Sequence, residues 1–170
     1  MKQILGCLVA LAFAAGTVTA QEATTPATPE AATPATHTFV KPMDIKYGDA
    51  PAVFAKGMRF AVISGDPGKE GPYVVRAKLP AGYKIMPHWH PTDENVTVSS
   101  GVFALGMGDK FDAKTMTRLA AGGFAQLGAN MHHYAMATTA TTIQVHGMGP
   151  FGLTYVNPED DPANKPAPAK

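Results

Sequence analysis

Apolar and polar residues alternate through the middle of the chain, and this pattern predicts short β-strands. Between residues 72 and 79, Tyr73, Val75, Ala77 and Leu79 take every second position, which places them on one face of an extended segment. Turns rich in Gly and Pro, such as residues 65–68, separate segments of this kind, and no strand–helix–strand rhythm is present. We therefore expect an all-β domain, built as a closed or double-sheet antiparallel barrel. The expected strands cover residues 58–64, 72–79, 95–100, 101–106, 124–127, 132–138, 141–148 and 151–156, and residues 109–117 are expected to form a short helical turn.

Three further segments differ in composition from this domain, which we place at residues 39–157. Residues 1–20 begin with Lys2, continue as an apolar run and end in Val18-Thr19-Ala20. This pattern is typical of a secretory signal peptide cleaved after Ala20, and the run is too short for a stable membrane span. Residues 21–38 are rich in Ala, Thr and Pro and predict a disordered linker, and residues 158–170, rich in Pro and acids, predict a disordered tail. We therefore expect a periplasmic or secreted protein with a single folded domain.

Charge and cysteine content narrow the class of partner. Cys7 is the only cysteine and lies in the expected signal peptide, so the exported protein would have neither thiols nor disulfides. Without residues 1–20, 13 basic and 13 acidic side chains remain, and this balance speaks against nucleic acid or an acidic membrane surface as a partner. We expect a small molecule bound in a pocket instead.

Residues 82–101 contain the side chains that are candidates for a functional site. His88 and His90 are two positions apart on an extended segment, so their imidazoles lie on the same face. Glu94 follows a turn and shares its face with Val96 and Val98, which directs the carboxylate toward the core. Burying two imidazoles and a carboxylate is costly unless a cation compensates them. The set therefore predicts a divalent transition metal, and the ligand types are compatible with Fe, Mn, Ni or Zn.

The same stretch resembles the first motif of the cupins. That motif is a Gly, five residues, His-x-His, three or four residues, a Glu, six residues and a Gly. All five fixed positions are matched here, by Gly82, His88, His90, Glu94 and Gly101.

The second cupin motif has a weaker counterpart. It consists of a Gly, five residues, Pro-x-Gly, two residues and a His, and it falls on Gly122, Gly128, Asn130 and His133. Gly128 replaces the Pro and Asn130 the second Gly, and Asn is one of the few residues that tolerates a left-handed backbone. The resemblance implies a jelly-roll-like, double-stranded β-barrel, His133 as the fourth metal ligand, and a homodimer. Strand alternation by itself only says that either His132 or His133 faces the site, and the cupin register selects His133.

His146 is a further candidate. It alternates with Gln144 and Met148 on a late strand, opposite Ile143 and Val145. We expect it either to contact substrate at the mouth of the pocket or to be a hydrogen-bonded structural histidine.

Two functions stay open at this level. The first is a metal-dependent oxidoreductase, similar to a dioxygenase, that acts on a small organic molecule, with no catalytic residue identified beyond the metal ligands. The second is a non-catalytic module in which the metal orients a small ligand such as a sugar or an organic acid. The cupin barrel supports both, since fold does not determine function.

Overall fold

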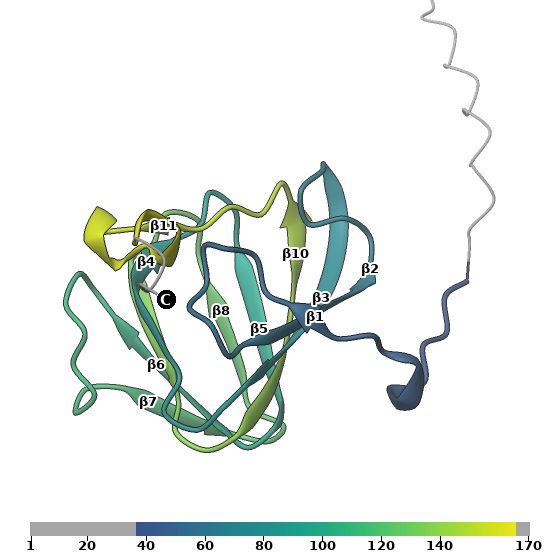
Figure 1. Ribbon diagram of the computed structural model, residues 1–170, viewed down its shortest axis with the longest axis horizontal. Helices are drawn as coiled ribbons and strands as arrows, with labels where there is room; N and C mark the ends of the chain where they lie inside the picture. The colour runs from purple at the N-terminus through teal and green to yellow at the C-terminus, as the bar shows by residue number, and fades with distance from the viewer. Residues whose placement is uncertain (1–36, 166–170) are drawn as a thin grey trace, which may run out of the picture. The chain divides into compact units, whose positions relative to one another are not determined.

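The computed structural model describes residues 37–165, which form strands joined by turns and by short 3₁₀ helices (Figure 1). Within this range, no helix has the length and apolar character needed to cross a bilayer. The expected signal peptide, residues 21–36 of the expected linker, and residues 166–170 of the tail lie outside the described residues.

The strands form two antiparallel sheets. The six-stranded sheet has the order β1-β2-β3-β10-β5-β8, and the five-stranded sheet has the order β11-β4-β9-β6-β7. Their bounds are Gly48–Asp49 (β1), Arg59–Ser64 (β2), Gly71–Leu79 (β3), Lys84–Trp89 (β4), Glu94–Ser100 (β5), Val102–Met107 (β6), Thr117–Ala120 (β7), Phe124–Leu127 (β8), His133–Ala137 (β9), Thr141–Gly149 (β10) and Thr154–Tyr155 (β11).

Strands that are distant in the sequence are neighbours in both sheets. In the six-stranded sheet β10 pairs with both β3 and β5, and in the five-stranded sheet β9 pairs with both β4 and β6. Across residues 37–165 the two sheets do not close into a single barrel. The fold is therefore a double-sheet jelly roll, and of the two architectures that the pattern allowed, the closed barrel is not the one observed.

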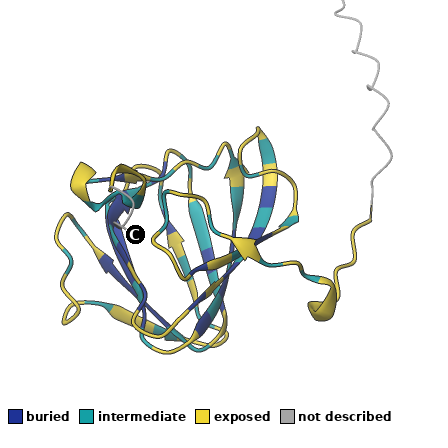
Figure 2. Ribbon diagram, viewed as in Figure 1, coloured by how far each residue is buried: buried dark blue, intermediate teal, exposed yellow. Residues whose placement is uncertain are grey.

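The core lies between the two sheets. Along β3 the buried residues are those that the alternation predicts, Tyr73, Val75, Ala77 and Leu79 (Figure 2). The neighbouring strand β10 buries Ile143 and Val145 in the same register. The strand alternation thus identified the core face of this sheet.

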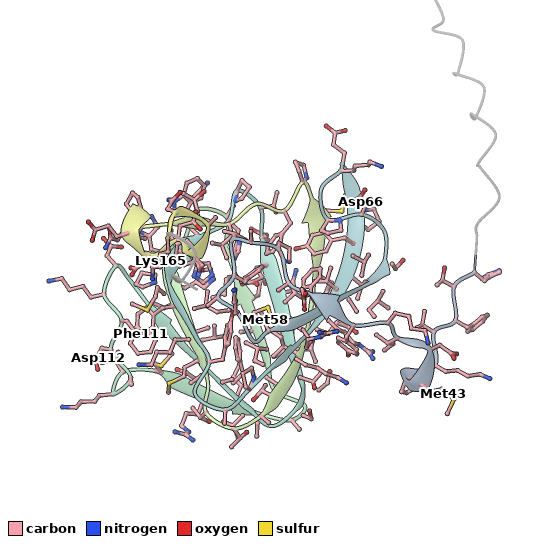
Figure 3. All side chains as sticks on the ribbon, in the orientation of Figure 1. Met43, Met58, Asp66, Phe111, Asp112 and Lys165 are labelled. Atoms are coloured by element: carbon pink, nitrogen blue, oxygen red, sulfur yellow. The ribbon has the colours of Figure 1, made fainter. Side chains whose placement is uncertain are left out.

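Several boundaries differ from the sequence prediction. Residues 109–117 contain no helix; they form an irregular loop and the start of β7, with Phe111 and Asp112 in the loop (Figure 3). In this loop the Asp112 carboxylate accepts a hydrogen bond from the Lys114 amide, a local turn that competes with a helix. The expected last strand, residues 151–156, is reduced to Thr154–Tyr155.

The described part of the tail is also more ordered than its composition predicts. Pro158–Asp160 and Pro162–Asn164 form two short 3₁₀ helices. Each begins with a proline and is capped by the residue before it, since the side chains of Asn157 and Asp161 accept hydrogen bonds from Glu159 N and Ala163 N. Local capping therefore supplies the order that this polar segment lacks in hydrophobic burial.

Candidate metal centre

Three buried histidines come together between the sheets. His88 on β4 pairs directly with His133 on β9, and His90 lies one residue beyond the end of β4. Their side chains are 3%, 3% and 2% exposed for His88, His90 and His133, and one ring nitrogen of each lies within 4.8 Å of the others. Such a cluster can coordinate a metal ion.

The backbone fixes the orientation of each ring. A carbonyl oxygen only accepts hydrogen bonds, so a ring nitrogen beside it must donate, and Nδ1 carries the proton. In a neutral imidazole, Nε2 then has a free lone pair, and this is the arrangement found around metal-bound histidines. The three hydrogen bonds join Nδ1 of His88 to the Met86 carbonyl at 2.7 Å, Nδ1 of His90 to the Gly152 carbonyl at 2.6 Å, and Nδ1 of His133 to the Met131 carbonyl at 2.9 Å.

Burial keeps at least two of these rings neutral at physiological pH. Desolvation, followed by the neighbouring His133 and His90, lowers the pKa of His88 to about 2. Desolvation also lowers the pKa of His90, although Glu94 and the Gly152 carbonyl favour its protonated form. Both side chains are therefore ready to bind a cation without first losing a proton.

Glu94 completes the cluster from the other sheet. It is the first residue of β5, and its Oε2 lies 3.3 Å from Nε2 of His133 and 3.6 Å from Nε2 of His90. Within the described part of the chain, those two nitrogens are buried and have no hydrogen-bond partner. With both rings neutral, lone pairs on nitrogen and oxygen face one another, an arrangement that needs a shared proton or a cation. The donor set therefore fits a divalent transition metal, and it does not specify which one.

A small cavity of about 40 Å³ adjoins the cluster. His88, His90 and Glu94 form part of its wall, and the ring of Phe151 stacks on His90 with centroids 4.2 Å apart. Apart from these three, the lining residues are apolar: Phe54, Met58, Phe60, Val75, Ala77, Ile85, Ile143, Val145, Phe151 and Leu153.

Known proteins resemble this chain in structure. No protein-family model matches the sequence, and no curated protein does. Among solved structures, a candidate acetylacetone dioxygenase from Methylibium petroleiphilum is 21% identical, with a TM-score of 0.59 over 76% of this chain and 88% of its own. The polyketide cyclase RemF from Streptomyces resistomycificus is 16% identical, with a TM-score of 0.62 over 75% and 91%. An RmlC-like cupin from Shewanella frigidimarina is 14% identical, with a TM-score of 0.52 over 66% and 91%.

This chain has the cupin fold. At such low identities the likeness shows the fold and leaves the activity open. The cupin fold nevertheless agrees with the sequence motifs, because both motifs meet at the histidine cluster.

The second cupin motif is held against the first by backbone contacts. Asn130 has a left-handed backbone with φ of 62°, as predicted for the residue that replaces the motif glycine. Its N–H donates to the His90 carbonyl at 2.8 Å, and the Ala129 N–H donates to the Asp93 carboxylate at 2.9 Å. The turn that precedes His133 is thereby fixed to the loop that carries His90.

The structure separates the two adjacent histidines. His133 is buried with the cluster, whereas the side chain of His132 is 40% exposed and its Nδ1 lies 2.6 Å from the Asp109 carboxylate. Strand pairing explains the choice, because His133 lies directly across from His88 in the five-stranded sheet.

His146 does not reach the cavity. It pairs with Val74 and Asn95 on β3 and β5, and Val145, its neighbour on β10, lines the cavity from the opposite face of the strand. β10 therefore turns its apolar residues toward this cavity, and His146 is not among the described residues that line it.

Two features of the site had no signal in the sequence. The Gly152 carbonyl that orients His90 lies 62 residues away along the chain, and any residue can supply a carbonyl. Phe54 reaches the cavity from a segment without a strand pattern, and Met58, the first residue of the expected strand 58–64, reaches it from just before β2.

Proposed function

We propose that this cupin is an exported, metal-dependent oxidoreductase that uses dioxygen to oxidise a small and largely apolar molecule. His88, His90, His133 and Glu94 would hold a divalent transition metal. The observation that carries the proposal is the convergence of three histidine Nε2 atoms, whose Nδ1 atoms face backbone carbonyls, and one carboxylate oxygen beside an apolar cavity.

The three histidines and the carboxylate have different physical roles in the proposed site. The three carbonyl hydrogen bonds hold the imidazoles in the tautomer that presents Nε2, so little reorganisation is needed when a metal binds. Glu94 contributes the negative charge that offsets part of the charge of a divalent ion in an apolar interior. Side chains from β4, β5 and β9 meet at this point, so the site draws on both sheets.

The cavity wall is compatible with a reaction in which the metal, and no other side chain, activates the reactants. Among the described residues that line it, only the proposed ligands carry ionisable groups, so no separate general acid or base is present. When bound, a redox-active metal would supply the open coordination positions for substrate and dioxygen. When dioxygen cleaves a C–C bond of the substrate and its two oxygen atoms enter the carbonyl or carboxyl products, the substrate itself supplies the four electrons, so no external reductant is needed. The apolar wall offers water few hydrogen-bond partners and accommodates the hydrocarbon part of the substrate.

The structural neighbours suggest where to begin the search for a substrate. One of them is described as a candidate acetylacetone dioxygenase, which motivates testing β-diketones first. The composition of residues 1–20 supports export.

Oxygen uptake by the metal-loaded protein tests the proposal. The protein is loaded anaerobically with Fe(II), and oxygen consumption is then followed across β-diketones, catechols and thiols. We expect consumption with at least one class. His133→Ala should abolish both metal binding and consumption, whereas the matched variant His132→Ala, at the partly exposed residue just before β9, should retain both.

Two results would contradict the proposal. Protein isolated from its native compartment without any transition metal, and unable to bind one, would remove the metal site. Protein that binds metal, shifts its spectrum with small ligands and never consumes oxygen would point to the alternative, a metal-dependent module that binds a small ligand without turnover.

A further inference from the structure

Two cavities of the domain meet at the same pair of side chains. An outer cavity of about 580 Å³ lies among residues 49–58, Pro162 and Ala163. The inner cavity of about 40 Å³ adjoins the histidine cluster. Phe54 and Met58 line both. Met58 belongs to the buried core and Phe54 packs against it, so these two side chains lie where the linings of the two cavities adjoin (Figure 3 labels Met58).

Two buried tyrosines hold the backbone on either side of Phe54. The Tyr155 hydroxyl donates to the Val53 carbonyl at 2.9 Å, and the Tyr83 hydroxyl donates to the Ala55 carbonyl at 2.6 Å. Tyr155 lies on β11, and Tyr83 directly precedes β4, the strand that carries His88. The segment that contains Phe54 is therefore anchored to the sheet that supplies three of the proposed ligands.

We propose that Phe54 and Met58 are a gate that selects the substrate of the metal site by size and charge. This inference rests on the proposed function and names its substrate class: small, uncharged molecules with an oxygen or nitrogen donor for the metal and an otherwise apolar body. Such a molecule enters through the outer cavity. It passes the gate by displacing side chains, while the tyrosine-anchored backbone stays in place.

The volume of the inner cavity sets the size limit. At ~10–15 Å³ for each water molecule, 40 Å³ holds about three of them, less than an organic substrate with a ring or a branched chain occupies. Larger molecules must displace the gate side chains. Met58 is well suited to this, because an unbranched thioether changes rotamer easily.

The wall of the inner cavity sets the charge limit. Since the proposed ligands are the only ionisable residues that line it within residues 37–165, a charged group that does not bind the metal would lose its hydration without compensation. The outer cavity differs in this respect, because Asp49 and Lys56 contribute to its lining. The gate therefore separates a partly polar chamber from an apolar one.

Binding of neutral probe ligands to the Co(II)-loaded protein tests the gate without any turnover. Imidazole and the bulkier 4-phenylimidazole are titrated at a pH where both are neutral, and the visible Co(II) spectrum reports binding. We expect the wild-type protein to bind imidazole at least ~10-fold more tightly than 4-phenylimidazole, a difference of ~1.4 kcal/mol. Phe54→Ala and Met58→Ala should reduce that ratio by ~10-fold, because both ligands exceed the cavity and the larger ligand gains more from its widening.

Matched controls come from exposed residues of the same type. Phe124→Ala and Met148→Ala remove side chains that are 54% and 57% exposed and contribute to neither cavity, so the ratio should stay at the wild-type value. Phe54→Leu keeps the position apolar and serves if Phe54→Ala does not fold. Tyr83→Phe and Tyr155→Phe should speed the entry of 4-phenylimidazole, because each releases one anchor of the backbone.

The outcomes separate the gate from the enzymatic activity. Gate variants whose ligand ratio matches that of the two controls overturn the gate, as does a wild-type protein that binds both imidazoles equally well. If the ratio changes as expected but the Fe(II) protein consumes no oxygen, the gate stands and the oxidoreductase proposal falls. Failure to bind Co(II) at all contradicts both.

Discussion

Replacing Glu94 with Gln should stabilise the metal-free protein and weaken its affinity for metal. Glu94 Oε2 lies 3.3 Å and 3.6 Å from two buried ring nitrogens that have no proton to donate when the rings are neutral. Glutamine has nearly the same shape, but its amide group can donate a hydrogen bond to Nε2 of His133. The substitution therefore converts an unfavourable contact into a hydrogen bond and removes the charge that a cation needs.

General magnitudes set the expected gain in stability and the expected loss of metal affinity. One net hydrogen bond contributes ~0.5–1.5 kcal/mol, and for a domain of this length ~1 kcal/mol corresponds to a rise in Tm of roughly 2–8 °C. Changes in groups that only support a ligand typically cost ~10–100-fold in metal affinity. Loss of a ligand charge should cost at least as much, so we expect a decrease of ~100-fold or more, which is ~2.7 kcal/mol.

Two measurements test the opposite signs of these effects. Urea unfolding in the presence of a chelator gives the free energy of unfolding of the metal-free protein, and competition with a chromophoric chelator gives the affinity for Zn(II) or Co(II). Glu70→Gln, an exposed carboxylate on the loop before β3, is the control and should change neither. Lower stability of metal-free Glu94→Gln combined with unchanged metal affinity would show that Glu94 has a structural role and would refute this account of the site.

Three further predictions concern the metal ligands, the buried Tyr83 and the contact between Gly106 and Tyr134. Metal at 100 times its dissociation constant should raise the free energy of unfolding by ~2.7 kcal/mol in the wild-type protein and in His132→Ala, as measured by chemical denaturation. An equal rise in His133→Ala would contradict the ligand assignment. Burial raises the pKa of Tyr83 to about 12 from an ordinary value near 10. The stability that the protonated Tyr83 hydroxyl contributes should therefore be complete below pH 10 and decline from pH 10 to 12 by at most ~2–3 kcal/mol. Chemical denaturation at stepped pH should show a smaller decline in Tyr83→Phe. A Cβ on Gly106 would overlap the ring of Tyr134, so Gly106→Ala should cost ~1–3 kcal/mol, and a double-mutant cycle should show this cost disappearing in a Tyr134→Ala background.

The sequence alone determined features that depend on neighbouring residues. Strand alternation placed His88 and His90 on one face and directed Glu94 toward the core, because side chains two positions apart on a strand share a face. The backbone preference of Asn explained how Asn130 takes the place of a glycine. These inferences needed no knowledge of which strands pair.

Only the tertiary structure decided features that depend on contacts between distant segments. Pairing of β4 with β9 brought His133 rather than His132 to the cluster, and the register of β10 turned His146 away from it. The Gly152 carbonyl that orients His90, and the contacts of Phe54 and Met58 with the cavity, join segments that are distant in the sequence, so alternation within one strand does not reveal them. The physical reason is that alternation specifies which side chains share a face within one strand, whereas the opposing element and its register follow from packing the whole core.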